Sequence, residues 1–170
     1  NRVFWKECCG LQRRGHEVVL ICAAEKDEVI DDVQILAVPK SRSRLLRITL
    51  TVARVCRRAI KQKADIYHFH DPELLPFVRL FSLLGRRVVF DMHENLPKAI
   101  EAMAWLGPVP IRKAVARVTK LFEPLLYWHI PVVYAEDSYP KDYPFVRRSV
   151  MVRNFPDLDV LLTIDSEKHA

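Results

Sequence analysis

The stretch DIYHFHDPELLPFVRLFSLLGRRVVFD, residues 65–91, indicates most clearly how this chain folds. Its two ends, residues 65–70 and 86–91, are short runs typical of strands, and residues 72–85 between them have the length of a helix. Pro72 suits the first turn of that helix and Gly85 suits its end. A strand, a helix and a second strand in this order predict two parallel strands joined by a crossover helix.

The same alternation continues in both directions along the chain. We expect further helices over residues 2–14, 43–63 and 111–128, the last bent or interrupted at Pro124, and further strands over residues 17–23, 33–39, 130–136 and 149–154. This order predicts an α/β domain with a doubly wound, mostly parallel sheet and helices on both faces. We expect the domain to span residues 1–158, with residues 159–170 as a linker or tail.

The composition is that of a globular protein with a positive charge, but it does not identify the partner. The chain has 170 residues, enough for one domain with a sizeable core, and its formal net charge is +6. A positive charge favours anionic partners such as phosphate groups, nucleic acid or an acidic membrane surface. The four cysteines form no C-x-x-C pair, which argues against a zinc site, and we expect a cytoplasmic setting. The sequence contains no apolar run of membrane-spanning length.

Polar side chains follow two consecutive predicted strands. His70 and Asp71 follow the strand at 65–70, and His93 follows the strand that closes with Asp91. Because parallel sheets bind ligands outside the carboxyl ends of their strands, we expect these groups at one edge of the domain. His93 is the best candidate for a functional group, and Asp91, Glu94 and Asn95 flank it.

Each of these residues also has a purely structural interpretation. His68, inside the strand, is expected to be buried and hydrogen-bonded. Asp71 precedes Pro72 and is placed to cap a helix, and Glu73 suits the first turn of that helix. Asp91 and His93 could simply tie a loop together.

A metal site is the first alternative. His68 and His70 lie two residues apart and share one face of a strand, so with Asp71, His93 and Glu94 they could supply metal ligands. Because no third spaced histidine follows, we predict no metal, while a metal-dependent hydrolase remains the rival interpretation.

The helix at 43–63 carries a stripe of basic residues, namely Arg47, Arg54, Arg58 and Lys61. The simplest interpretation is a solvated face. The alternative is electrostatic docking on an anionic membrane, to which the apolar loop at 103–111 could also contribute. A non-enzymatic module that binds anions is a further rival, but aromatic residues are not interleaved with the basic ones, so we predict no nucleic acid partner.

Residues 64–100, ADIYHFHDPELLPFVRLFSLLGRRVVFDMHENLPKAI, closely resemble the amino-terminal domain of family 4 glycosyltransferases, the retaining GT-B type. The opening RVFWKECCGLQRRGHEVVLICA resembles that family's first helix and second strand, and VMVRNFPDLD (150–159) resembles the exit from its first domain. The resemblance covers nearly the whole chain, and HDPELLP together with D-x-H-E is fairly specific.

The resemblance implies a Rossmann-like acceptor domain. It implies a nucleotide-sugar donor held mainly by a C-terminal donor-binding domain, a glycan, lipid-linked or small-molecule acceptor, and no catalytic metal or tightly bound cofactor. His93 would correspond to the family's histidine that contacts the transferred sugar, and His70, Asp71 and Glu94 would line the same cleft. The family's first strand with its Gly-rich loop and its E-x7-E donor helix are not recognised in this sequence. We therefore expect the chain alone to be inactive as a transferase.

Overall fold

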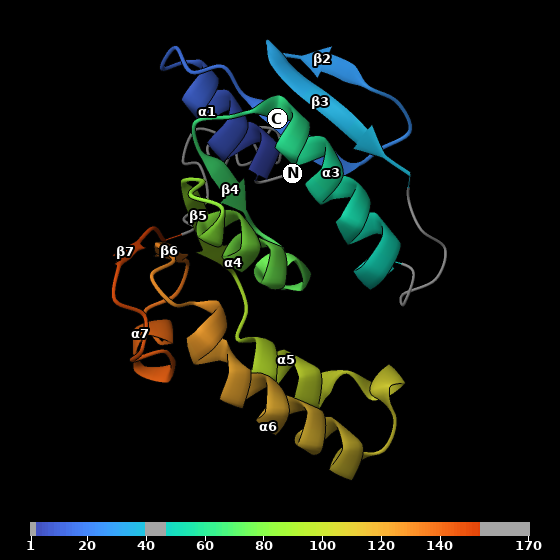
Figure 1. The fold of residues 1–170 in the computed structure, drawn as a ribbon, viewed down its shortest axis with the longest axis vertical. Coiled ribbons are helices and arrows are strands. Elements are labelled where there is room, and N and C mark those ends of the chain that lie inside the picture. Colours follow the sequence, from blue (N-terminus) through green and yellow to red (C-terminus); the bar gives the residue numbers. More distant parts are fainter. Residues whose placement is uncertain (1–2, 40–46, 154–170) are drawn as a thin grey trace, which may run out of the picture. The chain divides into compact units, whose positions relative to one another are not determined.

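The computed structural model describes residues 3–39 and 47–153, without the side chains of residues 47 and 48 (Figure 1). The predicted linker or tail at 159–170 lies outside these residues. Two compact units divide the chain, residues 1–67 and residues 68–170. None of the helices within the described ranges is long and apolar enough to cross a bilayer.

The first unit holds a three-stranded sheet in the order β1-β3-β2. β1 (Val19–Ala23) runs parallel to β3 (Val33–Val38), and β2 (Glu28–Ile30) pairs antiparallel with β3. The helical segments are η1 (Val3–Cys8), α1 (Cys9–Gln12), η2 (Arg47–Thr51) and α3 (Val52–Gln62). β3 is central and nearly all buried, whereas every residue of β2 is exposed.

Local sequence explains two features of this unit. Gly15 follows α1 with φ +84°, and its amide donates to the Gln12 carbonyl at 2.8 Å, as expected for a glycine that ends a helix. The sequence analysis did not predict β2. It joins β3 through Asp31 and Asp32, both at positive φ, which is the geometry of a tight two-residue hairpin turn.

The second unit holds a four-stranded parallel sheet in the order β4-β5-β6-β7. Its strands are β4 (Tyr67–Phe69), β5 (Val88–Met92), β6 (Val132–Tyr134) and β7 (Ser149–Met151). The helices are η3 (Pro72–Leu74), α4 (Leu75–Leu83), α5 (Leu96–Ala102), η4 (Ala104–Leu106), α6 (Val109–Leu126) and α7 (Tyr139–Asp142). Parallel strands connected through helices confirm the predicted α/β class.

The core of this unit lies between the sheet and α4. Phe69 of β4 meets Phe81 of α4 edge-on, with ring centroids 5.6 Å apart, and Phe90 of β5 meets Tyr127. Val78, Phe81, Phe90 and Tyr127 are all at most 2% exposed. These contacts pack one face of β4 and β5 against the helical layer. The side chains on the other face of the two strands do not take part in this core.

The predicted helices and the observed ones differ in detail. The segment at 72–85 is a 3-10 turn followed by α4. α6 is not interrupted at Pro124 but continues to Leu126. α5 and α7 were not predicted, and α5 lies side by side with α6 (Figure 1).

Candidate active site at the ends of β4 and β5

The alternation of β4 decides where its histidines lie. Tyr67 and Phe69 are buried, so the intervening His68 points to the opposite face, together with His70 just beyond the strand. Their rings lie close, with centroids 4.5 Å apart. His68 is exposed, and the expectation that it is buried in the strand is therefore wrong.

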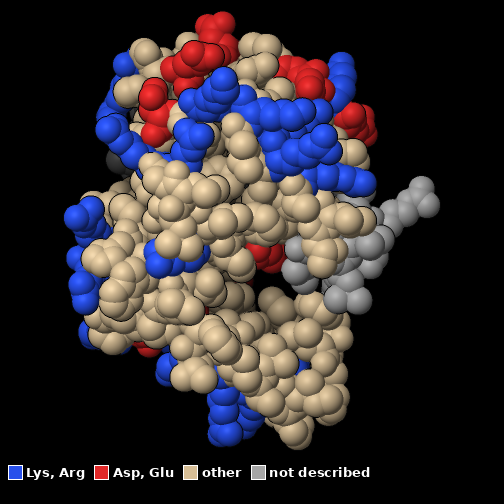
Figure 2. All heavy atoms as spheres, in the orientation of Figure 1, with Lys and Arg blue, Asp and Glu red and all other residues tan. Residues whose placement is uncertain are grey.

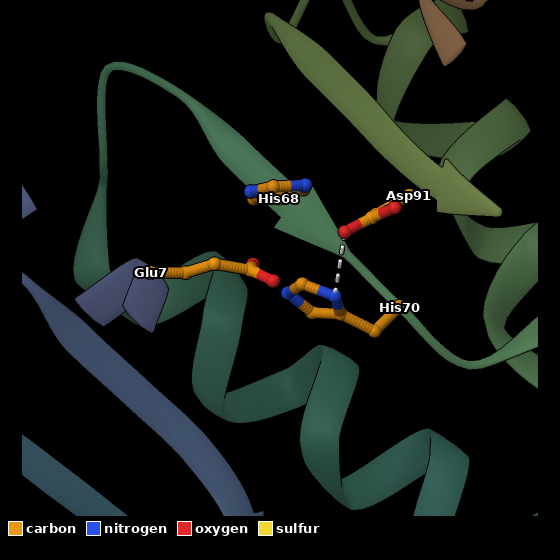
Figure 3. A group of neighbouring side chains, drawn as sticks. All are labelled: Glu7, His68, His70 and Asp91. Carbon is orange, nitrogen blue, oxygen red and sulfur yellow. Dashed lines mark ion pairs between the residues drawn. The ribbon is translucent and has the colours of Figure 1, made fainter. Parts of the chain in front are cut away.

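Asp91 is the centre of the site. It lies inside β5, opposite Val133 of β6, and is only 2% exposed. Its Oδ2 atom is 3.1 Å from Nε2 of His93 and 3.5 Å from Nδ1 of His70. Figure 3 shows the Asp91 carboxylate directed at the His70 ring, with His68 on the same side of the strand. One buried carboxylate thus connects the ends of two adjacent strands.

The two histidine rings are arranged around this carboxylate. They stack with an interplanar angle of 6° and centroids 5.7 Å apart. Nδ1 of His70 and Nε2 of His93 are 3.4 Å from each other. Because both nitrogens approach the same oxygen of Asp91, each is placed to donate its proton to the carboxylate. This favours the Nδ1-protonated form of His70 and the Nε2-protonated form of His93.

The electrostatics of the site favour a charged Asp91. Burial by itself would raise the pKa of this carboxyl, but the hydrogen bonds from His70 and His93 outweigh burial and hold the pKa well below its usual range. For His68, in contrast, burial has the larger effect on the pKa. The protein atoms packed around its ring lower its pKa to about 4, with a further contribution from His70, although the residue as a whole is exposed. His68 is therefore neutral near pH 7.

The loop after β5 is fixed from two sides. The Tyr139 hydroxyl donates to the His93 carbonyl at 2.8 Å. Asn95 caps α5 by accepting from the Lys98 amide at 3.2 Å, and its Nδ2 donates to Asp142 at 2.9 Å. Tyr139 and Asp142, which belong to α7, were not predicted from the sequence. They restrain the segment that carries His93.

The other residues predicted to contact a ligand, Asp71, Glu94 and Asn95, are not part of the contact between Asp91 and the two histidines. Glu94 and Asp71 are exposed. Asp71 occupies the position before η3, but its side chain makes no capping hydrogen bond; its carbonyl instead accepts from the Leu74 amide. Asn95, as described, serves as a helix cap. The structure thus brings His70, Asp91 and His93 together and places Asp71 outside that contact.

The donor atoms needed for a metal ion are also present on this face. The ligand atoms of His68, His70 and Asp91 lie within 4.8 Å of one another, and nitrogen and carboxylate oxygen are suitable ligands for zinc or manganese. Asp71, His93 and Glu94, which the sequence pattern includes in the cluster, are not members of this group.

Only part of the basic stripe on α3 is available to contact an anionic membrane. Arg58 contacts both carboxylate oxygens of Asp27, at 2.8 and 3.0 Å, and Asp27 also accepts from the Ala37 amide at 2.7 Å. These contacts lower the pKa of Asp27, the Ala37 amide most of all. Arg54 and Lys61 are exposed, and the side chain of Arg47 lies outside the described part of the chain. Arg58 therefore serves the packing of its own unit.

Comparison with known protein families identifies the family of this chain. A family model for the glycosyl transferase 4-like domain matches residues 1–135. This chain belongs to the glycosyl transferase 4-like family. The matched range includes all strands from β1 to β6, and with them His70, Asp91 and His93 of the candidate site. A search of curated proteins finds no match.

Proposed function

We propose that this chain is the acceptor-side domain of a retaining glycosyltransferase. The enzyme would move a sugar from a nucleoside diphosphate sugar to a glycan, a lipid-linked acceptor or a small molecule. The observation that supports this most is the Asp91 carboxylate between His70 and His93, at the edge where parallel α/β sheets bind ligands, in a chain of a glycosyltransferase family.

The chemistry of the site follows from that arrangement. Asp91 is too deeply buried to meet a substrate, so its role is to orient the two imidazoles. His93, whose side chain is 25% exposed, is placed to meet the transferred sugar near the reacting centre. An imidazole held through Nε2 can accept a hydrogen bond from a sugar hydroxyl through its second nitrogen or, when protonated, stabilise negative charge on an oxygen.

His70, with Asp71, Glu94 and Asn95, would contact sugar or acceptor hydroxyl groups. Exposed carboxylates such as those of Asp71 and Glu94 suit this role because two adjacent hydroxyls can donate to one carboxylate. The donor nucleotide would be held mainly by a second, C-terminal domain. Without that domain, residues 1–170 would not catalyse transfer at a measurable rate.

The test is a transfer assay on the complete protein that carries this chain. His93→Ala should lower kcat by about 100-fold or more, the usual loss for a missing acid–base or charge-stabilising group. His16→Ala is the matched control, because His16 is an exposed histidine of the other unit. Unchanged turnover in His93→Ala, with the protein folded, would remove this residue from the mechanism. A product with inverted anomeric configuration would contradict the retaining mechanism.

A metal-dependent hydrolase is the second candidate, favoured by the donor atoms of His68, His70 and Asp91. For the transferase we propose neither a catalytic metal nor a tightly bound cofactor. Metal analysis of the purified protein separates the two. Stoichiometric zinc or manganese, with activity lost on chelation, would favour the hydrolase, whereas sugar transfer that persists in a chelator would favour the transferase.

We also propose that the enzyme works in the cytoplasm at the surface of an anionic membrane. The positive charge of the chain, +6, supports this association because anionic lipids attract basic proteins. Co-sedimentation with anionic vesicles at low salt would support it, and binding that does not fall as salt rises would contradict an electrostatic contribution.

A further inference from the structure

α6 has its most apolar stripe on the outside. Ile111, Val115, Val118, Phe122 and Leu125 follow one another at helical spacings of four and three residues, and all are exposed. The residues of α6 that are buried against its own unit are Ala116 and Glu123. A surface helix ordinarily turns its large apolar side chains to the core. In α6 the side chains that face the core are instead those of a small residue, Ala116, and an acidic residue, Glu123.

The apolar surface is broader than a seam between two helices. Leu121, at 76% exposure the most exposed residue of the set, lies beside the stripe. At about 100° per residue, the side chains from Leu121 round to Val115 cover an arc of roughly 120°. A coiled-coil seam would need a narrow stripe flanked by charges of both signs.

The charges beside this surface are of one sign. Lys113, Arg117 and Lys120 are exposed on α6. At about 100° per residue, Arg117 lies roughly 40° beyond the Leu121 edge of the apolar arc and Lys113 roughly 80° beyond it, whereas Lys120 lies roughly opposite the centre of the arc. The one acidic residue of α6, Glu123, is buried. On the neighbouring α5, Glu101 is exposed. Figure 2 shows the region of α5 and α6, in the lower part of the view, as mostly uncharged surface with basic groups near its margin.

Tryptophans lie at both ends of the helix. Trp105, in η4, precedes α6, and Trp128 lies two residues after its end; both are exposed by 40% or more. Arg147 lies 5.2 Å from the centre of the Trp128 ring. Tryptophan and arginine are enriched where protein meets the lipid headgroup region, because their side chains combine an apolar surface with a polar group.

We propose that α6, with Trp105 and Trp128 at its ends, is a docking surface for the face of an anionic lipid bilayer. The helix would lie parallel to the membrane. Its apolar arc would enter the boundary between headgroups and acyl chains, and Arg117, with the long side chain of Lys113 next to it, would contact lipid phosphates. A second copy of this chain is a poorer occupant, because the exposed charges of α6 are all positive and offer a second α6 no opposite charge.

This surface differs from the basic stripe of α3 that the sequence suggested. The docking proposal rests on the proposed function only in that both name a membrane as the partner. Binding to vesicles can be measured without any sugar transfer. His93→Ala should therefore bind vesicles like the wild type, which separates a failure of this proposal from a failure of the proposed activity.

The experiment is co-sedimentation of the full chain with vesicles of phosphatidylcholine, alone or with about 30% phosphatidylglycerol. The wild type should bind the anionic vesicles, and binding should weaken as salt rises. Leu121→Glu/Leu125→Glu should lower the affinity at least about tenfold, since it puts charge into the apolar arc. Lys113→Gln/Arg117→Gln should lower the preference for anionic lipid by roughly fivefold per cation.

The matched control is Arg54→Gln/Lys61→Gln, which removes two exposed cations from α3 and should change binding less than about twofold. Circular dichroism of every variant checks that the fold is kept; the α3 and α6 variants are all changed at exposed positions. Binding that the α6 changes leave intact, or that only the α3 change abolishes, would overturn the proposal. A wild-type dimer that does not bind vesicles and that Leu121→Glu/Leu125→Glu makes monomeric would show that α6 contacts a second copy instead.

Discussion

Replacing Glu123 by glutamine should stabilise the protein at alkaline pH and leave it almost unchanged at acid pH. Glu123 lies on the buried face of α6, 2% exposed, where its Oε1 accepts a hydrogen bond from the Tyr143 hydroxyl at 3.2 Å. Burial raises the pKa of this carboxyl to about 7, against the opposing effects of Tyr143 and Lys120. Glutamine keeps the shape and the acceptor oxygen of the protonated acid but cannot ionise.

The sign and the size of the effect follow from linkage. Because the folded pKa lies above the unfolded value of 4.5, the stability contributed by neutral Glu123 is fully present below pH 4.5 and is lost as the pH rises through 7. The interval between the two values corresponds to about 3 kcal/mol, at about 1.36 kcal/mol per pKa unit. The free energy of unfolding of Glu123→Gln should therefore exceed that of the wild type by about 3 kcal/mol at pH 8, and by less than about 1 kcal/mol at pH 5.

Urea unfolding followed by circular dichroism at both pH values measures this difference. Glu101→Gln is the matched control, because Glu101 is exposed on the neighbouring α5 and its substitution should shift stability by less than about 0.5 kcal/mol. A gap between wild type and Glu123→Gln that is the same at pH 5 and pH 8 would refute the assignment of a protonated, buried Glu123.

Three further substitutions test local features by thermal or urea unfolding. Phe81→Ala removes the ring that packs on Phe69 and should cost about 3–5 kcal/mol; a loss below about 1 kcal/mol would show that this core contact is not formed. Gly15→Ala should cost about 1 kcal/mol, because φ is +84° there, and a stabilised variant would contradict that backbone geometry. Asn95→Ala removes the cap of α5 and the contact to Asp142 and should cost about 0.5–2 kcal/mol; equal stability would argue against the cap.

The position of the candidate site could be predicted from the sequence because parallel strands share a carboxyl edge. His70 and His93 are 23 residues apart in the chain and each follows a strand, and the strand–helix–strand pattern predicts that they meet. The depth of Asp91 was not predictable in the same way. A carboxylate near the end of a predicted strand looks like a loop residue, and only the contacts with both histidines explain its burial inside β5.

Other features depend on contacts that no local pattern indicates. Tyr139 holds the His93 carbonyl across 46 residues of chain. β2 is three exposed residues long, so it has neither the length nor the apolar alternation by which strands are recognised. The period of α6 predicts a helix, but a pattern of apolar residues normally indicates the buried face, and in α6 the stripe with the large apolar residues is the exposed one.

A double-mutant cycle in sugar transfer tests the central claim, that Asp91 acts on the transferred sugar through His93. The kcat of the complete protein would be compared for His93→Ala, Asp91→Asn and the double variant, with folding verified for each. Asp91→Asn alone should lower kcat at least about tenfold, whereas adding it to His93→Ala should lower kcat by much less, because only the orientation of His70 is then left for Asp91. Losses that multiply in the double variant, or full activity in His93→Ala, would contradict the account.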